Sequence, residues 1–472
     1  MFPQDVATQL PNETWRYVFL FFEGTVAQEP IDWSSEGVRH PPELTSLSLV
    51  CRRFYCLARD LLYRTILLSV GVRDFDEAKF AIVHTLAANT RMGSITRAVE
   101  LGRYSSWLDD NLDPSLEEVI DSLHIPRAFK AHLKKEPNCL GRYGPAIPFL
   151  ILALTPKVKL VHCSYDLERD ITVPWILGGH LDRETAGTPR KAIANYLVDL
   201  EEVRLAGSNG FDTINGIELV LLHPNIKTLH ISNFVCTKIA IDRMVFSDRP
   251  CSLQKLVLRD CAVDAPFVQH ILSRCKDLHS LEIYATCWCQ HTRNPGHVEM
   301  NMDQYGQTLR KFGQNLVRFN LDTSGLVSSH GIRGKIGSLR QLQHLRHLSI
   351  AKPQLADEDE TRYTMPLTET LPLPLETLHF YLASDYYSTP ENPNLFSEDN
   401  EEIFKVVSSG QFINLHKVSF IRLGIPGHDV FTKVIGGWDI QNNGGWDMAE
   451  EEVEIYERVL TEMELVMNRV VQ

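Results

Sequence analysis

Residues 200–205 read LEEVRL, and the spacing of their apolar residues returns seven more times along the chain. In each copy an apolar residue is followed by two mostly polar positions, a second apolar residue, one further position and a third apolar residue. Recurrence at intervals of about 20–50 residues is typical of stacked-repeat proteins. The other copies are IKTLHI at 226–231, LQKLVL at 253–258, LHSLEI at 278–283, LVRFNL at 316–321, LRHLSI at 345–350, LETLHF at 375–380 and LHKVSF at 415–420.

Each copy predicts a short strand, and the sequence between copies predicts helices. After the third copy, Asp264 is suited to cap a helix, and four apolar residues at helical spacing follow it: Phe267, Val268, Ile271 and Leu272. One strand and one helix cannot close a core alone, so successive repeats must stack. Unrelated strands in a compact α/β domain fit less well, because eight copies share one spacing. Weaker copies lie at 158–163, around 99–101 and at 66–68.

These copies resemble irregular leucine-rich repeats. The resemblance implies an α/β solenoid with parallel strands on its concave face and helices on its convex face. The Asn or Cys that usually follows the third apolar residue is matched cleanly only by Cys261. We therefore expect an uneven arc over residues 65–435, with insertions. The corresponding positions elsewhere hold Ser208, Phe234, Pro353 and Ala383.

The first seventy residues carry a different pattern, with two amphipathic helical runs. LPNE at 10–13 suits a helix start, because proline in the first turn costs no hydrogen bond, and Trp15, Val18 and Phe19 follow at helical spacing. The second run, LTSLSLVCRRFYCLARDLLY at 44–63, again places apolar residues on one face. So small a segment buries little surface alone, so it either needs a partner or caps the repeats.

Together the two runs strongly resemble the F-box motif of fungal F-box proteins, some of which carry irregular leucine-rich repeats. The resemblance covers residues 10–68 and implies three small helices over 1–64 that dock on the Skp adaptor, and through it on a cullin–RING ubiquitin ligase. The inserted loop 23–42 is longer than the family's usual turn. The implied adaptor-binding residues are Leu10, Pro11, Trp15, Val18, Leu44, Leu47, Val50, Cys51, Phe54 and Leu57.

The polar positions of the repeat strands are candidates for binding a protein substrate. They are expected to point toward the concave side, where basic residues and histidines recur. Arginine side chains there suit an acidic or phosphorylated segment of a substrate. A simply mixed polar surface explains the same composition. The candidate substrate-binding residues are Arg204, His230, Lys255, Arg318, Arg346 and His379.

Composition excludes several classes. The chain has 472 residues and a formal net charge of −13, which argues against a protein built to coat nucleic acid or membranes. Its apolar runs are too short to span a bilayer, and it begins without a secretory signal. Ten scattered cysteines suit reduced thiols. We expect a cytoplasmic or nuclear protein that binds neither nucleic acid nor membrane.

We find no catalytic motif and expect no enzyme activity, cofactor or metal. CWCQH at 287–291 lacks a second cysteine pair and is a weak zinc candidate. Acidic stretches at 356–362 and 384–402 predict solvated loops. Residues 436–472 predict a C-terminal helical cap, with the helix at 450–471, because the last repeat of a solenoid needs a cover.

These features favour a substrate-recognition subunit of a Skp–cullin–F-box ubiquitin ligase, with an unidentified protein target. A non-catalytic scaffolding repeat protein that pairs with the adaptor outside any ligase is the alternative. An enzyme within the insertions at 102–156 or 287–309 has little support. The first predicted strand, at 65–68, follows the N-terminal helices without a Gly/Ser spacer, so we expect a stiff junction.

Overall fold

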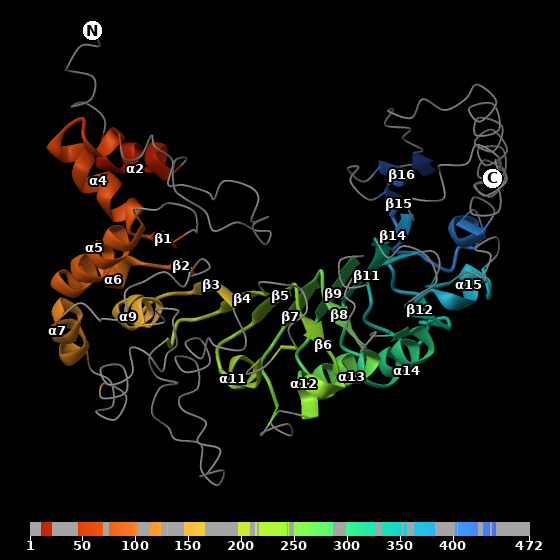
Figure 1. Ribbon diagram of the computed structural model, residues 1–472. Helices are drawn as coiled ribbons and strands as arrows, with labels where there is room; N and C mark the ends of the chain where they lie inside the picture. Colours follow the sequence, from red (N-terminus) through yellow and green to blue (C-terminus); the bar gives the residue numbers. More distant parts are fainter. Residues whose placement is uncertain are drawn as a thin grey trace. The chain divides into compact units, whose positions relative to one another are not determined.

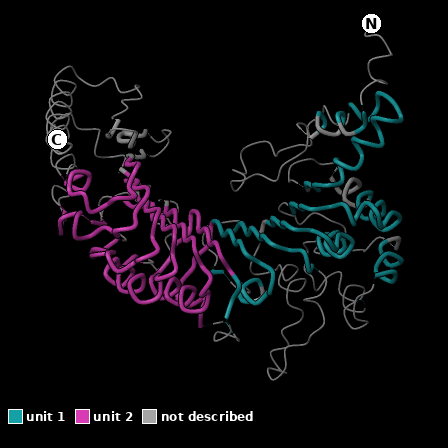
Figure 2. The backbone as a smooth tube through the Cα atoms, turned by 180° about the vertical axis from the view of Figure 1, so that it is seen from behind, with its two compact units in different colours: residues 1–232, 244–252 teal, residues 233–243, 253–472 magenta. Residues whose placement is uncertain are grey.

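The structure is a computed structural model, and its chain divides into two compact units (Figures 1 and 2). Unit 1 comprises residues 1–232 and 244–252, and unit 2 comprises residues 233–243 and 253–472. The structure describes residues 11–20, 46–68, 75–101, 114–123, 130, 146–165, 197–207, 213–214, 217–242, 244, 250–286, 299–325, 332–351, 354–355, 363–382, 402–403, 405–422, 428–434 and 437–439.

Unit 1 contains five parallel strands that pair in chain order. They are β1 (Thr65–Leu68), β2 (Ala98–Leu101), β3 (Leu160–Tyr165), β4 (Glu202–Gly207) and β5 (Thr228–Ser232). Its helices are α2 (Asn12–Leu20), α4 (Arg52–Leu62), α5 (Phe75–Ala88), α6 (Thr90–Ile95), α7 (Pro114–Ser122), α9 (Ala146–Leu154) and α11 (Ile217–Leu222).

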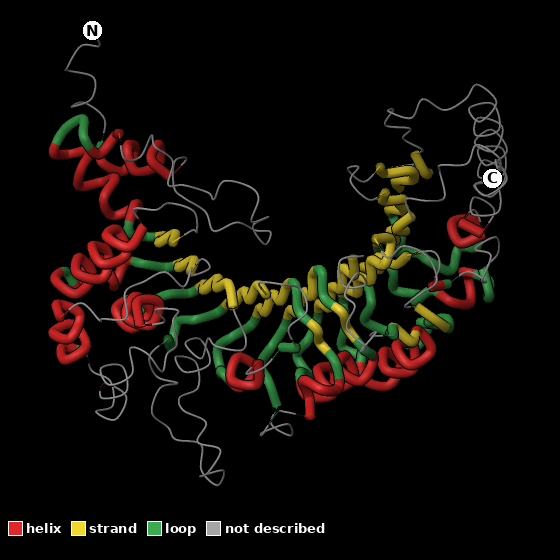
Figure 3. The backbone as a smooth tube through the Cα atoms, viewed as in Figure 1, coloured by secondary structure: helices red, strands yellow, loops and turns green. Residues whose placement is uncertain are grey.

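Unit 2 continues the alternation of strand and helix, and Figure 3 shows α12, α13 and α14 on one side of its strands. Its parallel strands are β7 (Lys255–Arg259), β9 (Ser280–Thr286), β11 (Arg318–Gly325), β13 (His347–Ala351), β14 (Thr377–Leu382) and β15 (Lys417–Arg422). Two antiparallel strands follow, β16 (His428–Val434) and β17 (Gly437–Asp439). Its helices are α12 (Lys238–Asp242), α13 (Ala265–Arg274), α14 (Met302–Phe312) and α15 (Leu367–Thr370). Two small parallel ladders pair β6 (Val235–Cys236) with β8 (Ala262–Val263) and β10 (Met300–Asn301) with β12 (Ile332–Arg333).

The repeating strands follow the sequence pattern closely. Each of the eight copies forms a strand that begins two residues after the first apolar residue of the copy, and the weaker copies form β1, β2 and β3. Leu316, Phe319 and Leu321 show why, because all three are 0% exposed. Phe319 lies opposite Leu281 on β9 and Leu348 on β13, so equivalent apolar residues of neighbouring repeats meet in one continuous core. Burial of each contributes about 1.5–3 kcal/mol.

Helix α13 forms as its sequence predicts. The side chain of Asp264 accepts a hydrogen bond of 2.8 Å from the backbone N–H of Phe267, which satisfies one of the unpaired donors at the helix start. The four apolar residues of the predicted face are buried. They are Phe267, Val268, Ile271 and Leu272.

The antiparallel pair β16–β17 differs from the parallel strands that the sequence predicts. In addition, β17 lies in the segment that the sequence predicts as a helical cap. Several predicted features lie outside the described residues: Leu10, Leu44, the loop 23–42, the CWCQH segment at 287–291, the loop 356–362, nearly all of 384–402 and the helix predicted at 450–471. None of the described helices is long and apolar enough to cross a membrane.

Candidate partner-binding surfaces

The N-terminal helices α2 and α4 pack on each other through an aromatic cluster. The rings of Trp15 and Phe54 lie 4.7 Å apart, and those of Phe19 and Phe54 lie 5.2 Å apart at 85°. Phe19, Phe54, Ala58 and Leu61 are buried. The Phe19–Phe54 pair is edge-to-face, and a pair of this kind adds about 0.5–1.5 kcal/mol beyond its area. Helices α2 and α4 thus share a core of their own. Residues 46–48 form a helical turn before α4.

This placement bears on four of the implied adaptor contacts. Phe54 is 5% exposed, so its ring holds the helix pair together rather than facing a partner. Trp15, Leu47 and Leu57 are partly buried against the same cluster. Their exposed atoms remain accessible, but most of their apolar area is already covered by the chain itself.

Other apolar residues of this segment remain exposed. Leu49 is 81% exposed, Val50 is 64% exposed and Val18 is 38% exposed. Tyr55, one turn into α4, is 47% exposed. Leu49 and Tyr55 were absent from the implied contact set, although the run LSLVCRRFY places them on either side of Val50 and Cys51. We call Val18, Leu49, Val50 and Tyr55 the N-terminal apolar set; Pro11 and Cys51 are exposed as well.

The junction between α4 and β1 is short and well bonded. Helix α4 ends at Leu62 and β1 begins at Thr65. The Thr96 hydroxyl donates to the carbonyl oxygen of Tyr63 at 2.8 Å, and the Arg97 N–H donates to that of Arg64 at 2.8 Å. These bonds connect the end of α4 to the segment before β2, which supports the expected stiff junction.

In unit 1, the side of the strands opposite the apolar core carries a row of polar residues. Register aligns Glu100 with His162, His162 with Arg204, and Arg204 with His230 across β2 to β5. Arg204 Nε lies 2.6 Å from Glu202 Oε1, and His230 Nε2 lies 3.5 Å from the same oxygen. The two predicted residues Arg204 and His230 therefore lie close together, and both contact the Glu202 carboxylate.

Glu100 and His162 of this row are buried, at 3% and 2% exposure, and Glu100 Oε2 lies 3.8 Å from His162 Nδ1. Neither atom has a hydrogen-bond partner among the described residues. The pair is enclosed, so it does not form part of an open binding surface.

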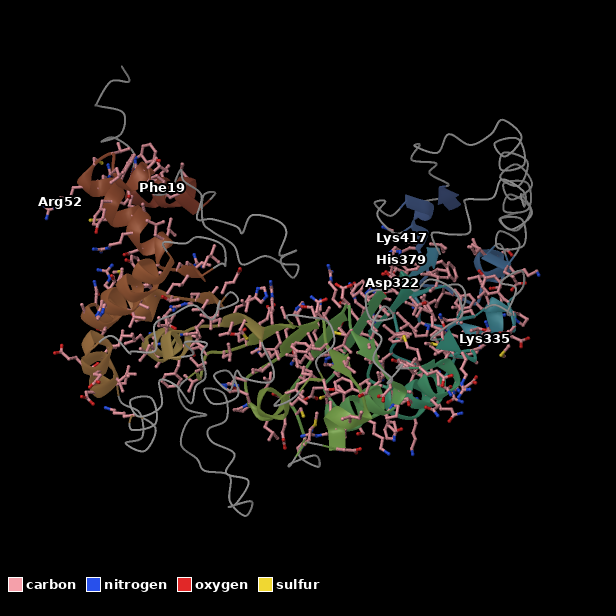
Figure 4. The ribbon with its side chains drawn as sticks, in the orientation of Figure 1. Phe19, Arg52, Asp322, Lys335, His379 and Lys417 are labelled. Carbon is pink, nitrogen blue, oxygen red and sulfur yellow. The ribbon has the colours of Figure 1, made fainter. Side chains whose placement is uncertain are left out.

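In unit 2, the other four candidate substrate-binding residues lie on the strands or, for Arg346, immediately before one. Lys255 Nζ lies 3.0 Å from Glu282 Oε1, and Arg346 Nη1 lies 2.6 Å from Glu376 Oε1. Arg318 is exposed and lies opposite His347 in the β11–β13 register. His379 sits on β14, on the strand side of the unit together with Asp322 and Lys417 (Figure 4).

The surroundings of two ionisable groups on this face, Glu282 and His347, lower their pKa values. Burial raises the pKa of the Glu282 carboxyl, but the hydrogen bond and charge of Lys255, with bonds from Tyr284 and Ser280, outweigh it and lower the pKa overall. Burial lowers the pKa of His347, and the nearby Arg318 guanidinium lowers it further. At neutral pH Glu282 is therefore anionic and His347 neutral.

The described residues contain no group of three or more His, Cys, Asp or Glu side chains that could hold a metal ion. Their polar side chains mostly pair across neighbouring strands, which suits a binding surface.

No protein-family model matches the sequence, and a search of curated proteins finds no match either. Among solved structures, one match is to the "Crystal structure of Rad7 and Elc1 complex in yeast", at 13% identity and a TM-score of 0.20. The alignment covers 74% of this chain and 92% of that chain. A likeness at this TM-score carries no weight for fold or function, which must come from the chain's own residues.

Proposed function

We propose that this chain is a non-catalytic substrate-recognition subunit of a Skp–cullin–F-box ubiquitin ligase. The N-terminal helices bind the Skp adaptor, and the strand face of the repeats binds a protein target. The proposal starts from the resemblance of residues 10–68 to the F-box motif.

The observation that carries the proposal is the exposed N-terminal apolar set. Leu49 and Val50 are 81% and 64% exposed, beside a helix pair that already buries its own aromatic core. Exposed large apolar side chains grouped in one short segment are typical of protein-binding sites. The alternative that these helices merely cap the repeats is less favoured, because a cap turns its apolar residues inward.

The stiff junction supports a ligase role in particular. A ligase must hold its substrate at a set distance from the transferring enzyme. Hydrogen bonds from Thr96 to Tyr63 and from Arg97 to Arg64 suit that requirement, since they leave no free linker between α4 and β1.

Adaptor binding is tested with the purified full chain and a recombinant Skp adaptor. We expect Leu49→Asp/Val50→Asp to weaken binding at least tenfold, because each carboxylate would be desolvated in the interface. Ile413→Asp, at a residue that is 74% exposed in unit 2, is the matched control and should bind as wild type does. Equal affinity of wild type and the double variant would overturn the proposal.

Cullin separates the ligase from the scaffolding alternative. When the full chain is captured with adaptor and cullin present, the ligase proposal expects cullin to co-precipitate through the adaptor. Adaptor without cullin would favour the scaffold.

Substrate binding by the strand face has its own test. Replacing Arg204, Arg318 and Arg346 by alanine is expected to reduce capture of substrates while adaptor binding is retained. Unchanged capture would remove these arginines from the substrate site.

A further inference from the structure

Helix α4 has one face inside the aromatic cluster and the opposite face in solvent. Its buried residues, Phe54, Ala58 and Leu61, follow one another at helical spacing. At about 100° per residue, Arg52 lies about 160° around the helix from Phe54. Arg52 and Tyr55 are both exposed, so the outward face of α4 begins with a cation and an aromatic ring.

The Arg52 guanidinium makes no hydrogen bond or ion pair with any residue that the structure describes. The other two arginines of the helix are engaged within the chain. Arg53 Nε donates to Asn12 Oδ1 at 2.6 Å, and Arg59 Nη2 lies 3.6 Å from Asp60 Oδ1. Figure 4 shows Arg52 extending away from the helix pair.

A cation at the start of a helix is unfavourable for the helix itself, because the N–H groups of the first turn carry partial positive charge. The first turn of α4 contains Arg52 and Arg53 and no acidic residue. Its N-cap is Cys51, whose sulfur accepts from the Phe54 N–H at 3.4 Å in place of the usual oxygen. Stability of α4 therefore does not explain Arg52, whereas the bond to α2 explains Arg53.

The N-terminal apolar set lies close to Arg52. Val50 is two residues away, so the Cα atoms of the two residues are at most about 7 Å apart, and Leu49 is one residue further. Tyr55 lies three residues after Arg52, which places both on one side of the helix. A partner that covers these exposed apolar side chains must therefore also meet the Arg52 guanidinium.

The charge of α4 indicates what the partner presents there. The helix reads RRFYCLARDLL, with three arginines and one aspartate. The aspartate, Asp60, is already engaged, because Arg91 Nη2 lies 3.0 Å from its Oδ2 and Arg59 contacts its Oδ1. The outward face is thus positive, and an acidic group on the partner complements it.

We infer that the Skp adaptor places a carboxylate against the Arg52 guanidinium, at the edge of the apolar contact. This deepens the proposed function, on which it rests, by naming the charge that the partner surface carries. Leu49 and Val50 supply the apolar contact, and the charge pair fixes its orientation and speeds encounter. Arg52 was not among the adaptor contacts that the sequence implied.

The affinity of the purified full chain for a recombinant Skp adaptor tests the inference. We expect Arg52→Glu to bind about tenfold more weakly than wild type, and Arg52→Gln about threefold more weakly. Lys276→Glu, at an exposed lysine of unit 2, is the matched control and should bind as wild type does. At about 1 M salt, where the screening length is about 3 Å, Arg52→Gln should approach wild type.

Hydrogen exchange separates binding from a structural role of Arg52. Because a positive charge is unfavourable at this end of the helix, amide exchange within Arg52–Leu62 in Arg52→Gln should be as slow as in wild type or slower. Faster exchange together with weaker binding would assign the loss to α4 itself and overturn the inference.

Charge exchange locates the carboxylate. Exposed acidic residues of the adaptor are replaced by lysine one at a time, and we expect one replacement that weakens binding of wild type and restores binding of Arg52→Glu. Wild-type affinity in Arg52→Glu, or no restoring replacement, would overturn the inference. If Leu49→Asp/Val50→Asp still lost the adaptor, the proposed function would stand without it. An adaptor that does not bind the wild-type chain would overturn both.

Discussion

Arg346 and Glu376, which lie immediately before β13 and β14, form an ion pair with 2.6 Å between Nη1 and Oε1. Lys255 pairs with Glu282 in the same way. These two basic side chains thus have acidic partners within the chain. An acidic target would have to displace these carboxylates, which makes the strand face less attractive to anions than its count of arginines indicates.

The Arg346–Glu376 pair should contribute little to stability, because both side chains retain solvent contact. A double-mutant cycle of Arg346→Ala and Glu376→Gln is expected to give a coupling free energy of about 0.2–1 kcal/mol from denaturant unfolding. At about 1 M salt, where the screening length is about 3 Å, the coupling should nearly vanish. A coupling above about 2 kcal/mol that survives salt would contradict the assignment of a solvent-screened pair.

Phe54 should be required for the N-terminal helices themselves. Phe54→Ala is expected to destabilise α2 and α4 by about 3–5 kcal/mol, because it empties the centre of the aromatic cluster. Faster amide hydrogen exchange within Arg52–Leu62 measures the effect. Val50→Ala, at a residue that is 64% exposed, should leave exchange unchanged. Exchange as slow in Phe54→Ala as in wild type would show that the aromatic cluster does not hold α2 and α4 together.

Gly306 in α14 allows a close approach between the helix and the loop after β12. A Cβ at this position would overlap the carbonyl oxygen of Ile336, so Gly306→Ala should lower the melting temperature strongly. Gly410→Ala is the control, because it tests the effect of backbone conformation without steric overlap. Gly410 has a φ of +66° and nothing within 4 Å of an added Cβ, so its substitution should cost only about 1 kcal/mol. Equal losses in the two variants would refute the packing argument.

Tyr305 connects two repeats of unit 2. Its hydroxyl donates to the carbonyl oxygen of Val263 at 2.9 Å, and the side chain is fully buried. Tyr305→Phe should reduce the free energy of unfolding by about 1–3 kcal/mol, because the carbonyl loses a donor that water cannot replace. Tyr55→Phe, at an exposed tyrosine, should have almost no effect. An unchanged free energy of unfolding in Tyr305→Phe would mean that the Val263 carbonyl oxygen accepts from another donor.

High pH should destabilise the fold through two buried phenols, Tyr305 and Tyr381, and the partly buried phenol of Tyr284. Burial raises the pKa of Tyr284 to about 12 and raises the pKa of Tyr305 and Tyr381 above the ordinary 10.0. Below pH 10 these phenols are neutral in both states, whereas above it the unfolded chain loses their protons first, so stability falls as pH rises. Denaturant unfolding between pH 9 and 11 measures the fall. Tyr284→Phe should make it shallower, and an unchanged slope would contradict the buried environment.

The repeat strands could be predicted from sequence almost residue by residue, because their signal is local. Three apolar positions per copy must all face one core, and each strand begins at the same place in its copy. The cap of α13 is local too, since Asp264 and Phe267 are three residues apart. Phe54 could not be assigned in this way. Apolar spacing shows that Phe54 and Val50 belong to a helical segment, but not which of them meets Trp15 and which remains exposed.

The amino-acid sequence by itself determined the number of repeats, the positions of their strands and the identity of their buried residues, because a periodic apolar pattern has only one way to bury itself. Tertiary structure alone decided which charges neutralise one another and which, like Arg52, lack a partner among the described residues. Arg346 pairs with Glu376, on the segment before the next strand, and Lys255 pairs with Glu282, on the neighbouring strand. Such groups meet only when the register of the sheet is set, and periodicity within one repeat contains no information about contacts across several.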